Sequence, residues 1–88
     1  MKKYRVWNVI NPPSKPKYYP VGTPLLGYML INRLANEQLK DKRIWANAFG
    51  LEVFEDGEWT EWYDEEGRDV DEAFEEGEDK NEVDRETD

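Results

Sequence analysis

The chain has 88 residues, a formal net charge of −9, and no cysteine or histidine. A chain of this length forms one small domain, and the missing residue types exclude disulfide bonds, thiolate zinc sites and histidine-based acid–base catalysis. Residues 1–50 carry nine Lys/Arg and two acids, whereas residues 51–88 carry three Lys/Arg and nineteen acids. Because the acidic half would repel nucleic acid, direct nucleic-acid binding is not expected.

The first predicted element is a strand over residues 3–10 (KYRVWNVI), which is rich in aromatic and β-branched residues. The next segment, residues 11–23, contains four prolines. Prolines remove backbone donors and restrict the residues before them, so we predict a semi-rigid loop without regular structure. The side chains that this loop would present are Lys15, Lys17, Tyr18 and Tyr19.

A helix is predicted over residues 24–40, because Thr23 is a suitable N-cap and Pro24 suits the first helical position. Gly27 lowers helix propensity, and close packing against a sheet is the reason we expect for its presence. The side chains expected to face the core are Leu26, Leu30, Ile31 and Leu34.

Two further strands are predicted to form a hairpin. The segment 44–55 contains the second strand, residues 58–64 form the third, and Asp56-Gly57 between them is a two-residue turn that needs positive φ. Pairing around this turn puts Glu52 opposite Glu61. The side chains expected toward the helix are Phe49, Leu51, Val53, Thr60 and Trp62. Those expected on the exposed face are Glu52, Phe54, Trp59, Glu61 and Tyr63.

The predicted fold is a single α+β domain in the order β-α-β-β, with a three-stranded, mainly antiparallel sheet and one helix on one face. The domain is expected to cover residues 1–76, with a short helical turn at 69–76. Residues 77–88 form an acidic tail whose composition predicts disorder. Among the many aromatic residues, we assign Trp7, Trp45 and Trp62 to the core and Tyr18, Tyr19 and Trp59 to the surface.

The exposed face of the hairpin is the first candidate site. Like charges directly opposite one another are unfavourable, so Glu52 and Glu61 either splay apart in solvent or have a cationic partner, Arg or Lys, between them. Two glutamates without further oxygen ligands make a poor metal site, and neither a metal nor a cofactor is expected. Aromatic side chains beside carboxylates suit a partner protein with a basic surface. The residues predicted to bind it are Glu52, Phe54, Trp59, Glu61 and Tyr63.

Two other functions remain open. One is sequestration of a nucleotide or nucleotide signal, because cations bind phosphate and aromatic rings stack on bases. The other is imitation of DNA by carboxylates, although the longest acidic run is the segment expected to be disordered. Enzyme activity is not expected, since the sequence has no glycine-rich phosphate loop and no nucleophile–base set. The residues predicted for the nucleotide site are Arg5, Lys15, Lys17, Tyr18 and Tyr19.

Two stretches, YRVWNVINPPSKPKYYPV and NAFGLEVFEDGEWTEWYDEEGRDVDE, resemble small uncharacterised proteins encoded by bacteriophages and prophages. The resemblance covers most of residues 4–72 and implies an acidic accessory protein that binds, and could inhibit, a host molecule. It assigns no functional residues. The chain has no run of about 20 apolar residues, so we expect a cytoplasmic protein outside the membrane. An edge strand, either 3–10 or 58–64, could pair with a second copy to form a homodimer.

Overall fold

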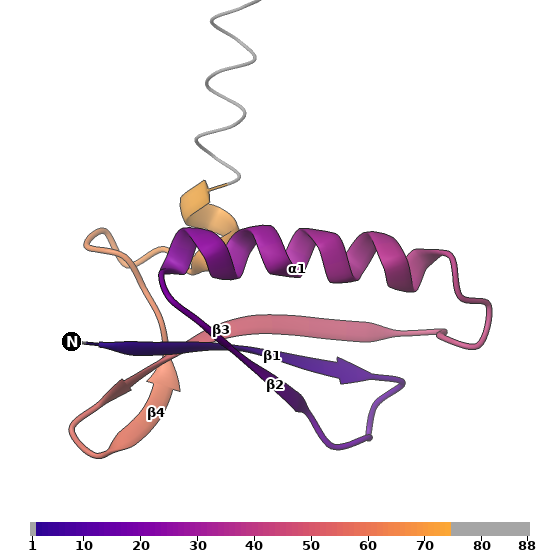
Figure 1. Ribbon diagram of the computed structural model, residues 1–88, viewed down its shortest axis with the longest axis horizontal. Coiled ribbons are helices and arrows are strands. Elements are labelled where there is room, and N and C mark those ends of the chain that lie inside the picture. The colour runs from indigo at the N-terminus through magenta and orange to yellow at the C-terminus, as the bar shows by residue number, and fades with distance from the viewer. Residues whose placement is uncertain (1, 75–88) are drawn as a thin grey trace, which may run out of the picture.

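The computed structural model describes residues 2–74, which form a four-stranded antiparallel sheet with one main helix on one face (Figure 1). In chain order the elements are β1 (Lys3–Ile10), β2 (Lys17–Val21), α1 (Pro24–Leu39), β3 (Asn47–Glu55) and β4 (Glu58–Glu61). The order of strands across the sheet is β2-β1-β3-β4. The predicted α+β class is confirmed, and the predicted number of strands is corrected from three to four.

The additional strand is β2, in the segment predicted to be a loop. Only Pro20 lies within β2, and the other three prolines lie in the connection before it. An edge strand pairs on one side alone, so it can accommodate a residue without a backbone donor. The register places Tyr18 opposite Trp7 and Tyr19 opposite Val6. The prediction of no regular structure over residues 11–23 is therefore wrong for residues 17–21.

The position of β1 also corrects the predicted homodimer. β1 lies between β2 and β3, so residues 3–10 have no free edge with which to pair. The edges of the sheet are β2 and β4. Pairing of a second copy with residues 58–61 stays a prediction.

The hairpin turn and the start of the helix form as predicted. Asp56 and Gly57 have φ of 54° and 82°, the positive values that a two-residue turn of this type requires. Thr23 Oγ1 accepts a hydrogen bond from the backbone N of Leu26 at 3.1 Å, and Pro24 is the first helical residue. These local signals act through a few neighbouring residues, which explains why they could be recognised in the sequence.

The buried face of α1 differs from the predicted one. A Cβ at Gly27 would lie 2.7 Å from Leu51 Cδ1, so the missing side chain allows the helix to approach the sheet closely. The helix is turned so that Gly27 faces the sheet, and Leu26, which was predicted to be in the core, is half-exposed. The buried residues of α1 are Gly27, Tyr28, Ile31 and Gln38.

The core lies between α1 and the inner face of the sheet. After β4 the chain returns to α1, where the backbone of residues 70–74 is helical, as predicted for the start of the segment 69–76. The ring centroid of Phe74 lies 5.3 Å from that of Tyr28 and 6.2 Å from that of Trp62. The predicted domain limit at residue 76 and the predicted disordered tail lie outside the described residues. The buried hydrophobic residues are Val6, Tyr28, Ile31, Leu51, Val53 and Val70.

A chain of amide side chains closes the other end of the core. Asn8 is fully buried, its Oδ1 accepts a hydrogen bond from Gln38 Nε2 at 2.7 Å, and its Nδ2 donates to the carbonyl of Ala48 at 3.1 Å. Gln38 Oε1 accepts from Asn47 Nδ2 at 2.9 Å. Within residues 2–74, every buried side-chain polar atom has a partner. These bonds therefore hold β1, α1 and β3 in register.

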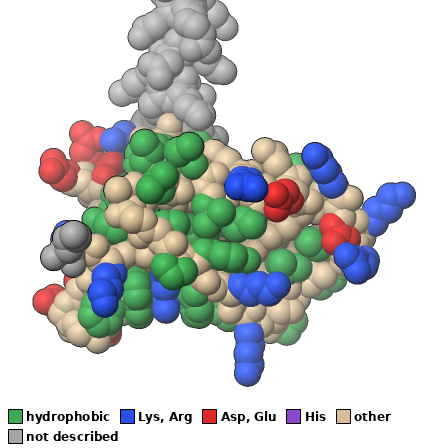
Figure 2. All heavy atoms as spheres, viewed as in Figure 1, with side chains coloured by type: hydrophobic (Ala, Val, Ile, Leu, Met, Phe, Trp, Pro, Cys, Tyr) green, Lys and Arg blue, Asp and Glu red, His purple; other side chains and the backbone are tan. Residues whose placement is uncertain are grey.

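Trp45 is on the surface, although the sequence predicted it to be in the core. It lies between α1 and β3 and is 72% exposed. Its backbone N donates to Asn11 Oδ1 at 2.8 Å, so this segment is tied to the end of β1. Figure 2 shows Lys and Arg side chains around the end of the molecule where α1 leads into β3, with hydrophobic side chains along α1 and below it.

Candidate functional site

The candidate site is on the face of the sheet opposite α1. The helix packs on the side of Val6 and Leu51, so the alternate positions of each strand face away from it. Because side chains directly opposite each other share a face, the three registers identify which residues meet there. We define the outer face by Arg5, Trp7, Tyr18, Glu52, Phe54, Trp59 and Glu61.

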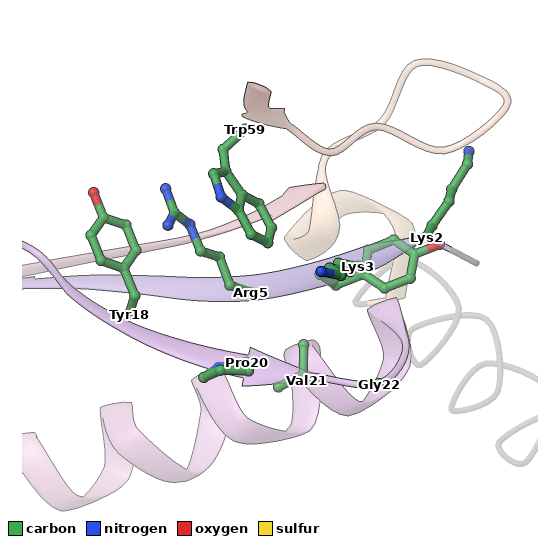
Figure 3. A pocket seen from close by; sticks show the side chains of 9 residues that line it. Lys2, Lys3, Arg5, Tyr18, Pro20, Val21, Gly22 and Trp59 are labelled. Carbon is green, nitrogen blue, oxygen red and sulfur yellow. The ribbon is translucent and has the colours of Figure 1, made fainter. Parts of the chain in front are cut away.

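Arg5 occupies the centre of the outer face and is held on three sides. Its Nε donates to Glu52 Oε1 at 2.8 Å. Its guanidinium carbon lies 3.8 Å from the ring centroid of Tyr18 and 4.2 Å from that of Trp59. Figure 3 shows the Arg5 side chain between the two rings. A planar guanidinium can stack on aromatic rings and bind a carboxylate at the same time, so Arg5 orders all three neighbours.

The predicted cross-strand pairing of Glu52 with Glu61 is confirmed. Their repulsion is reduced by the chain itself, because Arg5 binds Glu52 and Trp7 Nε1 donates a long hydrogen bond to Glu61 Oε1 at 3.4 Å. Among residues 2–74, Glu52 therefore has an ion-pair partner and Glu61 has none.

The carboxylate of Glu61 is in an unfavourable environment for its charge. Although the residue as a whole is exposed, partial burial of the carboxylate raises its pKa above the usual value. The hydrogen bond from Trp7 opposes this rise, and the negative charges of Glu52 and Asp69 add to it. A positive charge beside Glu61 would be stabilised by the same field.

The remaining aromatic side chains are arranged by close contacts in the sheet. A Cβ at Gly50, which is opposite Trp7, would overlap the indole ring, so the absence of a side chain lets Trp7 lie against β3. The rings of Phe54 and Trp59 meet edge to face, with centroids 5.3 Å apart and an interplanar angle of 62°. Trp7, predicted to be in the core, is therefore a partly buried residue of the outer face.

Four of the five residues predicted to bind a protein partner lie together. Glu52, Phe54, Trp59 and Glu61 belong to the outer face, whereas Tyr63 follows the end of β4 and is outside the sheet. The hairpin register alone was enough to group these four. The contribution of Arg5, Trp7 and Tyr18 was missed, because it depends on how β1 and β2 join the hairpin.

The five residues predicted for a nucleotide site are not brought together. Arg5 and Tyr18 are in contact on the outer face. Tyr19 and Lys17 are opposite Val6 and Asn8, so they face the side of the sheet where α1 packs, and Tyr19 is half-buried there. Lys15 is in the connection before β2. Because side chains alternate along β2, Tyr18 lies on one face of the sheet and Lys17 and Tyr19 lie on the other. The sequence could have predicted this separation only if residues 17–21 had been recognised as a strand.

A hollow of about 500 Å³ lies beside Trp59 (Figure 3). Trp59 is on one side, β2 is on the other, and the side chains of β1 lie between them. Sequence reasoning missed this hollow because it joins residues from the first and last strands of the sheet. Among the residues that line it are Lys2, Lys3, Arg5, Pro20, Val21 and Trp59.

No protein-family model matches the chain, and the comparisons with curated proteins and with solved structures give no match either. Residues 2–74 contain no group of three or more Asp or Glu side chains placed to hold a metal ion. In the same residues, no helix has the length and apolar character needed to cross a membrane. The chemistry of the outer face is therefore the basis for a functional proposal.

Proposed function

We propose that this chain is a non-enzymatic binding protein that docks on a basic protein surface through its outer face. The observation that supports this proposal is the difference between Glu52 and Glu61. Arg5 compensates Glu52, whereas Glu61 carries a raised pKa and has no cation beside it within residues 2–74. A Lys or Arg side chain of a partner would fill that position and stabilise the ionised carboxylate.

The aromatic residues of the outer face supply the apolar part of the interface. Tyr18 and Phe54 are 46% and 38% exposed, and Tyr and Trp are enriched among residues that dominate binding energies. Arg5 already orders the rings of Tyr18 and Trp59, so docking would cost little side-chain entropy at these positions. An ordered aromatic surface on the same face as an uncompensated carboxylate fits a partner that presents Lys or Arg.

The net charge of the chain and its resemblance to phage-encoded proteins indicate which kind of partner it would bind. A net charge of −9 increases the rate at which a basic partner arrives, because opposite charges steer association. The resemblance to small phage-encoded proteins supports a host protein as the partner, with inhibition as the result of binding.

The proposal is tested by affinity capture from a bacterial extract, followed by calorimetric titration of the captured protein. The informative variant is Glu61→Lys, which sets like charges against each other in the complex. At about 0.15 M salt, where the Debye length is about 8 Å, it is expected to weaken binding at least about tenfold.

Glu58→Lys is the matched control, because it makes the same charge change on the same strand. Glu58 is opposite Glu55 and faces the other side of the sheet, so the control is expected to change affinity by less than about twofold. Thermal unfolding of both variants checks that the fold is intact. Unchanged affinity for Glu61→Lys, or an equal loss for both variants, would show that the outer face is not the docking surface.

A further inference from the structure

We propose that the hollow beside Trp59 binds a small planar anion, with a nucleoside monophosphate as the model ligand. The planar ring would lie against Trp59, and the anionic group would pair with Lys3. The hollow shares Arg5, Tyr18 and Trp59 with the outer face, but ligand binding there does not depend on Glu61, on which the docking proposal rests.

The hollow has the size and the walls of a small-molecule site. Its volume of about 500 Å³ falls within the range of about 300–1,000 Å³ that is typical of ligand pockets. Figure 3 shows the indole of Trp59 on one side and Pro20 and Val21 on the other. A flat ring that enters the hollow would meet apolar surface at Trp59 and at Pro20, which favours an aromatic ligand.

The cations around the hollow differ in what they already bind. Lys2 Nζ lies 3.0 Å from Glu55 Oε2, and Arg5 is paired with Glu52. Lys3 makes no ion pair with any residue of the described chain, and none of the residues that line the hollow is acidic. An anionic group is therefore the chemistry that complements Lys3.

The wall of the hollow is ordered by contacts that do not involve a ligand. The Arg5 guanidinium is stacked on Trp59, the rings of Trp59 and Phe54 are in contact, and Lys3 is directly opposite Phe54 in the sheet. Lys3 and Trp59 therefore lie on either side of Phe54, and both line the hollow. Because Trp59 is already fixed, a ligand ring would lose little binding energy to ordering it. Arg5 positions Trp59 and does not bind the anionic group of the ligand, since its guanidinium is already paired with Glu52.

The charge around the hollow favours a small anion over a nucleic-acid strand. Fields are screened over about 8 Å at physiological salt, so a small ligand responds mainly to the local lysines. A longer polyanion would extend beyond these lysines over a chain whose net charge is −9, which opposes its binding. The site therefore selects a single anionic group attached to a ring.

The test uses the full-length chain labelled with nitrogen-15 and titrated with adenosine, guanosine and uridine monophosphates. The indole N–H signals of the four Trp residues are followed, and Trp59→Phe identifies the signal of Trp59. A saturable shift of the Trp59 signal is expected with at least one of the three nucleotides. Trp45 is in the segment between α1 and β3, so its signal is expected to stay unchanged. Inorganic phosphate, which has no ring, is expected to shift the Trp59 signal much less.

The charge variant is Lys3→Gln, with Lys42→Gln as its matched control. Loss of one charge-assisted contact is expected to weaken nucleotide binding about tenfold, whereas Lys42 lies outside the hollow and its variant should bind as the wild type does. Capture of a protein partner should survive Lys3→Gln, so failure of this site is distinguishable from failure of the docking proposal.

Three results would overturn the proposal. The first is no saturable Trp59 shift with any of the nucleotides at about 5 mM, where even a Kd near 1 mM would be detected. The second is equal affinity of the wild type and Lys3→Gln. The third is an equal response to inorganic phosphate, which would remove the role of the ring.

Discussion

Arg5 links all four strands through its own side chain. It extends from β1 and contacts Tyr18 of β2, Glu52 of β3 and Trp59 of β4. The pair with Glu52 is about one-fifth exposed on each side, so it is less screened by solvent than a surface pair. Its contribution to stability should therefore exceed that of an exposed ion pair elsewhere in the molecule.

Arg5→Ala is expected to lower the free energy of unfolding by about 2 kcal/mol, because it removes two stacking contacts and leaves Glu52 opposite Glu61 without a cation. Arg5→Lys keeps the charge but loses the planar stack, so it should restore only part of the stability. Both values can be measured by urea unfolding.

Arg33→Ala is the control for this prediction. Arg33 pairs with Glu37 one helical turn away, at 3.6 Å and in solvent, so the loss should be below about 0.5 kcal/mol. An equal loss for Arg5→Ala and Arg33→Ala would show that the stack contributes nothing beyond an ordinary surface pair.

At the level of elements, the packing of α1 on the sheet is set by a glycine. Helix propensity argues against Gly27, yet the close approach of Leu51 leaves no room for a side chain there. The sequence predicts this role for Gly27 but also predicts Leu26 in the core, because periodicity alone does not determine the rotation of a helix. That rotation depends on the strands below it and on Phe74, which packs on Tyr28 from the end of the described chain.

Gly27→Ala is expected to destabilise the protein, with the cost of overpacking against Leu51, about 1–3 kcal/mol, exceeding a propensity gain of about 1 kcal/mol. Asn32→Ala is the matched control, since Asn32 is exposed on the same helix and gains only propensity. Thermal unfolding should show a lower midpoint for the first variant and an unchanged or higher midpoint for the second. A higher midpoint for Gly27→Ala would mean that the helix does not pack closely at this position.

At the scale of the whole molecule, carboxylates respond to pH in two opposite ways. Partial burial raises the pKa of Glu61 and Asp71, with the charge of Asp69 acting in the same direction on both. Hydrogen bonds from Arg43 lower the pKa of Asp41 to about 2, and bonds from Arg68 lower that of Asp64. As pH falls, the folded state therefore binds protons at Glu61 and Asp71 at a higher pH than the unfolded state does. At Asp41 and Asp64 it binds them at a lower pH than the unfolded state does.

These shifts predict a maximum in stability at mildly acidic pH. A raised pKa means that the folded state binds a proton before the unfolded state does, so the contribution of Glu61 to stability increases as pH falls through its pKa, above 4.5. The contribution of Asp41 is present above its unfolded value of 3.8 and is lost as pH falls toward 2. Urea unfolding from about pH 7 to about pH 2.5 would measure both the rise in unfolding free energy and its loss at lower pH.

Glu61→Gln tests the two parts of this pH profile separately, because it removes one of the carboxylates whose pKa is raised. The rise in unfolding free energy between about pH 7 and about pH 4.5 should be smaller in this variant, while the loss at lower pH should be the same. A rise of unchanged size would show that Glu61 does not carry the raised pKa.

Features determined by neighbouring residues could be recognised in the sequence alone. The turn at Asp56-Gly57, the Thr23 cap and the register that groups Glu52, Phe54, Trp59 and Glu61 need only backbone geometry and alternation. Only the tertiary structure decided that β2 is an edge strand, that Trp45 is outside the core, and that Arg5 lies between Tyr18 and Trp59. The physical reason is that these positions depend on strands distant in the chain, whose order across the sheet is selected by packing of the whole core.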